Sequence, residues 1–292
     1  MTDVAAPIEI RDFADPRLDD FRDLSSADRR PDRSGGPALV IAEGVPVVQR
    51  LLASPYQVRA VLGVAPRIEA LATELREVAA PVYVATAEVM ARAVGFHLNR
   101  GVLASADRLP TPSVEELLDP AEAGPGSAWT SDIDSVKRIA VLEGVNDHEN
   151  LGSIFRNAAA LGMDAVLLGP GCADPLYRRA VRVSMGHVLA VPFTELAASP
   201  SFAAWPGALA QLRAAGFSVL AMTPRPDSLA LRDLDPARYP RAAVLVGAEG
   251  PGLSEPALAL ADLRVRIPMR PGVDSINVAT AAAIAFAHLA PP

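Results

Sequence analysis

Hydrophobic residues occur along this chain in short runs, separated by segments whose apolar positions recur at helical spacing. In the second half, apolar runs predict strands over residues 136–145, 164–169, 187–193, 217–223, 242–249 and 263–269. Helical patterns separate them, over residues 150–161, 174–184, 202–215, 255–261 and 277–288. Strands that are apolar throughout and alternate with helices predict an α/β fold, a mostly parallel sheet with helices on both faces.

The first half repeats this alternation on a smaller scale. The pattern predicts a strand and a helix within residues 38–54, a strand over 58–64, a helix over 68–78, a strand over 82–86 and a helix over 87–93, followed by the apolar run 101–106. These elements predict a small α/β domain. Residues 11–36 hold many Asp and Arg and few apolar residues, which favours an extended or helical arm.

A segment rich in proline, glycine and acid separates the two halves. Residues 109–129 show no sustained apolar period, which is typical of a linker. We therefore predict an arm and first domain over residues 1–108, a linker over 109–134 and a second domain over 135–292.

Charge and composition narrow the function classes. The net charge is −7, but residues 109–134 alone hold six acidic and no basic residues, so both predicted domains are near neutral. Local basic clusters in these domains can still contact phosphate, so the acidic net charge does not exclude a nucleic-acid partner. The single cysteine, Cys172, excludes an internal disulfide and a multi-thiolate zinc site, and we expect no metal. The start of the chain is acidic, and the longest apolar stretch, 278–290, is shorter than a bilayer span of roughly 20 residues. We expect a cytoplasmic protein without a membrane anchor.

Three short blocks in the second half combine glycine or proline with polar residues at predicted strand ends. They cover residues 150–162, 244–253 and 267–283. Because ligands of parallel α/β sheets bind at the carboxyl ends of the strands, we expect the three blocks to surround one ligand.

Common nucleotide and hydrolase motifs do not account for these blocks. Gly247, Gly250 and Gly252 are spaced three and then two apart, the reverse of G-x-G-x-x-G. The chain contains neither G-K-[ST] nor the G-x-S-x-G of serine hydrolases.

Taken together, the blocks resemble the SpoU/TrmH family of RNA ribose methyltransferases. The resemblance covers residues 136–290. Asn150, Gly152 and Arg156 match N-x-G-x-x-x-R, and the glycines with Glu249 match G-x-E-G-x-G-L. The third block, with Ile267, Pro268, Met269, Ser275, Asn277 and Val278, is similar to I-P-M…S-L-N-V. Ile276 replaces the usual leucine, and His148–Glu149 stands where the family often has Pro-Gly.

The resemblance implies a deep trefoil knot that holds S-adenosylmethionine (SAM). It assigns the cofactor contacts to Gly247, Gly250, Ile267 and Ile276, with Thr223 as a weaker candidate. The remaining polar residues are the predicted catalytic group, in which Asn150, Glu249, Ser275 and Asn277 order the site around Arg156. Asn150 is also a candidate cap of the helix that follows.

Arg156 is the residue that the family's pattern connects with activation of the ribose hydroxyl. A guanidinium stays protonated in proteins and is therefore a poor base. We therefore expect Arg156 to position the nucleotide and to stabilise the developing 2′-alkoxide.

The predicted partners are RNA and a second copy of the chain. Residues 41–54 and 97–104 resemble the ribosomal-protein-like domain that holds RNA in this family, and Arg100 lies within it. Arg178, Arg179 and Arg182 form a basic step on one predicted helix, which could follow RNA phosphates or simply be solvated. The apolar segment 278–290 favours a buried helix or a dimer interface, and family members pair through the knot.

The most specific interpretation is 2′-O-methylation of a ribose in ribosomal or transfer RNA. Two alternatives remain open: methylation of a base, and a non-catalytic RNA-binding or ribosome-assembly factor.

Overall fold

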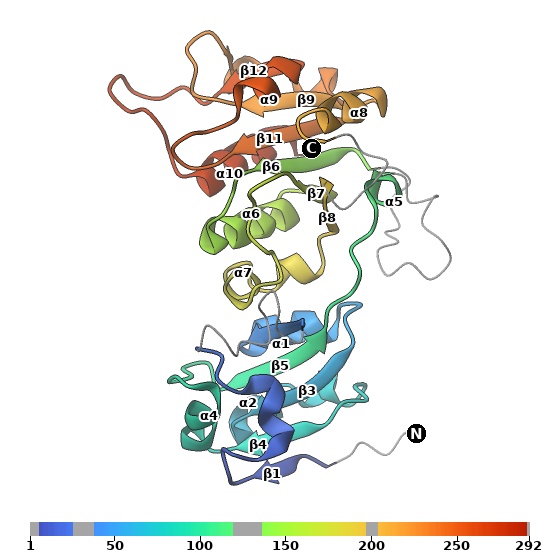
Figure 1. Ribbon diagram of the computed structural model, residues 1–292, viewed down its shortest axis with the longest axis vertical. Coiled ribbons are helices and arrows are strands. Elements are labelled where there is room, and N and C mark those ends of the chain that lie inside the picture. The colour runs from blue at the N-terminus through green and yellow to red at the C-terminus, as the bar shows by residue number, and fades with distance from the viewer. Residues whose placement is uncertain (1–5, 26–37, 119–135, 197–203, 291–292) are drawn as a thin grey trace. The chain divides into compact units, whose positions relative to one another are not determined.

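The computed structural model describes residues 6–25, 38–118, 136–196 and 204–290 (Figure 1). Contacts within the chain group it into two compact units. The first unit comprises residues 1–110 and 175–190, and the second comprises 111–174 and 191–292.

A mixed five-stranded sheet forms the first unit. Its strands, in spatial order, are β1 (Ile8–Ile10), β4 (Val82–Ala85), β3 (Val58–Gly63), β5 (Val102–Asp107) and β2 (Leu39–Glu43). β1, β4 and β3 are parallel, whereas β5 runs antiparallel to β3 and β2. Its helices are α1 (Val45–Leu52), α2 (Ala65–Glu69), α3 (Ala72–Leu75), α4 (Ala87–Val94) and, from the later segment, α7 (Arg178–Val183). The helix predicted over 68–78 is therefore two short helices, α2 and α3.

The arm predicted at residues 11–36 is part of the first unit's core as far as residue 25. A 3₁₀ helix, Pro16–Phe21, follows the N-cap Asp15. Leu18, Phe21 and Leu24 are fully buried and share the core with Ile10. Their spacing of three residues is the period of a 3₁₀ helix. Residues 26–36 of the predicted arm lie outside the described residues.

The second unit is built on a seven-stranded sheet in which every strand pair is parallel. Its strands, in spatial order, are β10 (Leu229–Ala230), β12 (Leu263–Arg266), β9 (Ser218–Met222), β11 (Ala242–Gly247), β6 (Arg138–Glu143), β7 (Ala165–Leu168) and β8 (Phe193–Glu195). The predicted α/β sheet is thus confirmed.

Helices bury both faces of this sheet. Residues of α5 (Val114–Leu118), α8 (Ala208–Ala214) and α9 (Glu255–Leu260) share one hydrophobic cluster with alternate residues of the strands. α6 (His148–Ala160) and α10 (Val278–Leu289) pack against each other, α6 also against β7 and α10 against β11 (Figure 1). No helix among the described residues is long and apolar enough to cross a membrane.

Two segments differ from the prediction. The run 187–193 is a 3₁₀ helix at His187–Leu189, and β8 begins only at Phe193. Gly186, at φ 83°, precedes that turn, and the apolar Val188 and Leu189 are buried by it. Within the predicted linker, Val114, Leu117 and Leu118 of α5 are buried in the second unit's core. This part of the segment is therefore a helix of the second unit and not a linker. Residues 119–134 lie outside the described residues.

Candidate functional site

Polar residues from the three sequence blocks meet beyond the carboxyl ends of the strands in the second unit. Asn150 lies in the first turn of α6, Glu249 follows β11 by two residues, and Asn277 is the N-cap of α10. Their side chains are joined directly, because Asn277 Nδ2 donates to Asn150 Oδ1 at 2.7 Å and to Glu249 Oε1 at 2.8 Å.

Both the nitrogen and the oxygen of the Asn277 amide form hydrogen bonds. Its oxygen accepts from the backbone N–H groups of Ala279 at 3.0 Å and Thr280 at 3.2 Å, which caps α10. Only this orientation of the amide satisfies both the helix end and the two side-chain acceptors. Asn277 therefore orients Asn150 and Glu249 while it begins the last helix.

The expectation that Asn150 caps its helix is wrong. The N-cap of α6 is Asp147, whose Oδ1 accepts from the N–H groups of Glu149 at 2.9 Å and Asn150 at 2.8 Å. Asn150 is thereby left to accept from Asn277. A second contact joins the same two helices, because Asn157 Nδ2 donates to the Ala279 carbonyl at 2.9 Å.

The loop after β11 borders a cavity of about 410 Å³. The loop closes on itself, since Gly252 N donates to the Ala248 carbonyl at 3.1 Å. A Cβ at Gly247 would lie 2.4 to 2.6 Å from backbone atoms of Gly252 and Leu253, so the close turn requires glycine at this position. The cavity is lined by Met222, Pro224, Val246, Gly247, Ala248, Glu249, Gly250, Gly252, Ser275, Ile276, Asn277, Val278 and Ala281.

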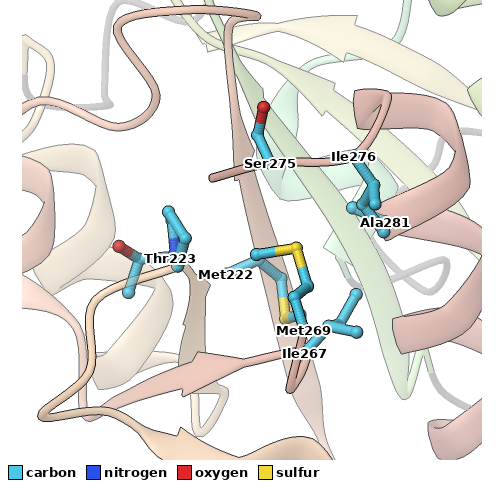
Figure 2. Close-up of a pocket in the computed structure, with 8 residues that line it drawn as sticks. Met222, Thr223, Ile267, Met269, Ser275, Ile276 and Ala281 are labelled. Atoms are coloured by element: carbon cyan, nitrogen blue, oxygen red, sulfur yellow. The ribbon is translucent and has the colours of Figure 1, made fainter. Parts of the chain in front are cut away.

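A smaller cavity, about 100 Å³, adjoins the first (Figure 2). Met222 and Thr223 come from the end of β9, Ile267 and Met269 follow β12, and Ala281 belongs to α10. The two cavities share five lining residues: Met222, Pro224, Ser275, Ile276 and Ala281. The surfaces are mainly apolar side chains, glycine and backbone.

All residues predicted to contact a cofactor line one or both cavities. Thr223 and Ile267 border the smaller cavity, Gly247 and Gly250 the larger, and Ile276 both. Of the predicted catalytic residues, Ser275, Glu249 and Asn277 also line the larger cavity. An apolar slot with backbone donors and acceptors and a few polar groups at one end fits an adenosine that carries an amino-acid tail.

Arg156 stands apart from this hydrogen-bonded group. It lies on α6, one residue before Asn157, and its side chain is exposed. Among the described residues it has no hydrogen bond or ion pair, so the guanidinium extends from a helix that is itself held to α10. An exposed arginine without a side-chain partner among the described residues is available to an anionic ligand.

The four predicted RNA contacts all lie in the first unit, and one is occupied by the protein itself. Arg178 begins α7 (Arg178–Val183), and its Nη1 lies 3.1 Å from Oε2 of the buried Glu43. The same guanidinium lies 4.7 Å from the centre of the Phe96 ring. Arg178 therefore has a structural role within the first unit, and its contact with RNA stays a prediction.

The other three predicted RNA contacts differ in exposure. Arg179 and Arg100 are exposed, and Arg182 is half-buried. The stem of Arg100 passes close to Gly44, where an added Cβ would lie 2.8 Å from Arg100 Cδ.

Glu143 is a buried carboxylate beside the site that the motifs did not reveal. It ends β6 and is 9% exposed. Its Oε1 accepts from Trp205 Nε1 at 2.5 Å, and its Oε2 accepts from Ser254 N at 2.9 Å. The sequence signal was an acid at the end of an otherwise apolar strand. Among the described residues, no three His, Cys, Asp or Glu side chains lie together as a metal site would need.

Comparison with known proteins identifies the family. Residues 137–287 match the model of the SpoU rRNA methylase family. The chain belongs to this family. It is 56% identical, over 95% of its own length and 90% of the relative's, to an uncharacterized tRNA/rRNA methyltransferase of Mycobacterium tuberculosis.

Another relative matches about half of the chain, and a solved structure matches nearly all of it. The 23S rRNA (guanosine(2553)-2′-O)-methyltransferase of Bacillus subtilis is 31% identical over 53% of this chain and 58% of its own length. The AdoMet-bound rRNA methyltransferase from Sinorhizobium meliloti has the same fold, with a TM-score of 0.73 over 96% of each chain and 23% identity.

Proposed function

We propose that this SpoU family member transfers a methyl group from SAM to a ribose 2′-hydroxyl of ribosomal or transfer RNA. The observation that carries the proposal is the Asn277 amide, which joins Asn150 of the first block to Glu249 at the border of a cavity lined by the second and third blocks. The B. subtilis relative is a 2′-O-methyltransferase, which supports the choice of ribose.

The two adjoining cavities are the proposed cofactor site. Bound there, SAM would supply a methyl group on a positively charged sulfonium. Ile267 and Ile276 offer apolar contact area, and Gly247 and Gly250 let the backbone approach closely. The AdoMet in the S. meliloti structure supports this cofactor.

Arg156 is proposed to hold the RNA rather than to remove the proton. As the bond from the methyl carbon to the 2′-oxygen forms, the carbon–sulfur bond breaks, S-adenosylhomocysteine leaves and the hydroxyl proton passes to solvent water. Its guanidinium is exposed and free of protein partners among the described residues, so it can donate to a phosphate or to the 2′-oxygen. A planar cation beside the developing alkoxide would stabilise the negative charge of the transition state. Asn150, Glu249, Ser275 and Asn277 would keep the nucleotide and the cofactor aligned for in-line displacement.

The first unit is proposed to hold RNA, with Arg100 and Arg179 as its exposed contacts. The predicted division into an RNA-binding half and a methyltransferase half stays part of this proposal, with residues 111–118 packed in the second unit and residues 175–190 grouped with the first. We also propose the trefoil knot that the resemblance implies. It is supported by Ile267, Met269 and residues 275–277, which line the same cavities as residues 222–224, 246–250 and 252.

A dimer through α10 completes the proposal. Ile284 is 40% exposed on this helix and shares a face with Thr280 and Ala287, which are also exposed. Replacing Ile284 with glutamate should convert the dimer to a monomer in light scattering. A wild-type protein that is monomeric at micromolar concentration would refute the dimer.

Labelled methyl transfer tests the main proposal. Purified protein, tritiated SAM and RNA from a strain lacking the gene should give label that co-migrates with 2′-O-methylated nucleosides after digestion. Label on a base would replace ribose chemistry with base methylation. SAM binding without transfer to any RNA would favour a binding or assembly factor.

A further inference from the structure

Glu143 is unusual among the acids of this protein. In the described part of the chain, Glu43 and Glu143 are the two buried carboxylates. Glu43 has a cation, Arg178, at 3.1 Å. Glu143 forms no salt bridge with a described residue and depends on two neutral N–H donors. A buried carboxylate without a cation is costly, so both donors matter to it.

The two donors belong to segments on opposite sides of β6. In the sheet, β6 lies between β11 and β7, and Glu143 is in register with Gly247 of β11. Ser254 follows the loop after β11. Trp205 lies against the end of β7, where an added Cβ at Gly169 would be 3.4 Å from the indole. The carboxylate therefore joins the chain beyond two neighbouring strands.

One of these segments is the cavity loop, residues 247–253. The loop is held at its start by β11 and by the close packing of Gly247 on Gly252 and Leu253. Its far end is held by the bond from Ser254 N to Glu143. Between these two points, one backbone bond closes the loop, from Gly252 N to the Ala248 carbonyl at 3.1 Å. At its tip, Gly250 has positive φ, and an added Cβ there would meet nothing within 4 Å.

We propose that Glu143 is a positioning residue that fixes the cavity loop in its ligand-binding shape, an inference that rests on the proposed SAM site. Five residues of this loop line the larger cavity, among them Glu249, which Asn277 also holds. With the far end released, the loop would occupy its binding shape only part of the time. The apparent affinity for SAM falls in proportion to that fraction.

Trp205 sets the direction of the carboxylate. Because its indole N–H occupies Oε1, Oε2 is left to face Ser254 N. Glu143→Gln preserves the size of the side chain but replaces one acceptor with an N–H₂ donor. That donor must then face either the indole N–H or the Ser254 N–H, and one bond is lost.

A double-mutant cycle with SAM as the probe tests this role. Calorimetry should give Glu143→Gln a Kd for SAM at least about tenfold above wild type, equivalent to about 1.4 kcal/mol. Trp205→Phe keeps a ring over Gly169 and removes the N–H, so it should weaken binding less than about threefold. In Glu143→Gln with Trp205→Phe, the new amide N–H₂ faces a ring while its oxygen accepts from Ser254. The Kd should therefore recover to within about threefold of wild type.

Hydrogen exchange of the ligand-free proteins provides the structural readout. Glu143→Gln should speed exchange of the amides from 248 to 254, and the double variant should restore protection. A purely structural role would lower the melting temperature without this local pattern or the rescue. A wild-type protein that binds SAM while Glu143→Gln binds it equally would overturn the inference alone. A wild-type protein that binds no SAM would reject the proposed function and, with it, the role of Glu143 toward the cofactor.

Discussion

Replacing Asn277 with aspartate would separate the two tasks of its amide. The oxygen caps α10 through Ala279 and Thr280, whereas the nitrogen donates to Asn150 and Glu249. Aspartate caps helices as well as asparagine does but has no N–H. The cap should therefore survive in Asn277→Asp while both side-chain bonds are lost.

The expected energies follow from these contacts. In Asn277→Asp a second carboxylate faces Glu249, a repulsion of about 1 kcal/mol at about 4 Å in water. The favourable position at a helix N-terminus offsets about 0.3–1 kcal/mol of it. The free energy of unfolding should stay within about 1 kcal/mol of wild type. Asn277→Ser, a cap without charge, should be closer still, whereas Asn277→Ala should lose about 1 kcal/mol because the cap is gone.

Activity should respond differently from stability. Without the Nδ2 donors, Asn150 and Glu249 are no longer aligned, and a misplacement of about 1 Å costs roughly a hundredfold in rate. Urea unfolding and tritium transfer from SAM to RNA, measured on the same preparations, would separate the two effects. Near-wild-type transfer by a stable Asn277→Ser protein would refute the reasoning.

Three further predictions concern the glycines of the cavity loop, Arg156 and Cys172. Gly247→Ala should unfold at lower urea than Gly250→Ala, because its Cβ meets backbone at 2.4 Å, an overpacking cost of about 1–3 kcal/mol or more. At Gly250 the Cβ meets nothing within 4 Å and only the φ of 85° is unfavourable, so equal midpoints would contradict the packing argument. Arg156→Lys should keep wild-type stability, since the side chain is exposed, and lose most methyl transfer; near-full turnover would exclude a planar positioning role. Burial raises the pKa of the Cys172 thiol above its ordinary value of 9.0, so iodoacetamide should label it more slowly than free cysteine at pH 8 and speed up only at higher pH. Rapid labelling of folded protein at pH 7 would argue against that burial.

The hydrophobic pattern was sufficient for the sheet of the second unit, because its longer strands hold unbroken apolar runs, residues 139–142 in β6 and 242–246 in β11. It was insufficient for β10, which has two residues, and for His187–Leu189, where a buried 3₁₀ turn has the same composition as a strand. Periodicity describes burial, and short buried segments of either kind look alike.

The residues of the candidate site were likewise predictable from the sequence only in part. Gly247 and Ile276 were predicted because each belongs to a compact local motif, and both line the cavities. Glu143 was missed because its partners, Trp205 and Ser254, lie 62 and 111 residues away in the sequence. Likewise, nothing near Arg178 in the sequence indicates that it pairs with Glu43, 135 residues earlier.

The hydrogen bonds of Asn277 also have a consequence for synthesis of the protein. They join residues 127 and 28 positions apart, and Asn277 follows all seven strands of the second unit's sheet. During translation, the strands can pair before the residue that unites Asn150 with Glu249 has left the ribosome. A polypeptide released before residue 277 could therefore carry the complete sheet and still have an open site. A measurement of SAM affinity would distinguish full-length molecules from truncated molecules whose secondary structure is the same.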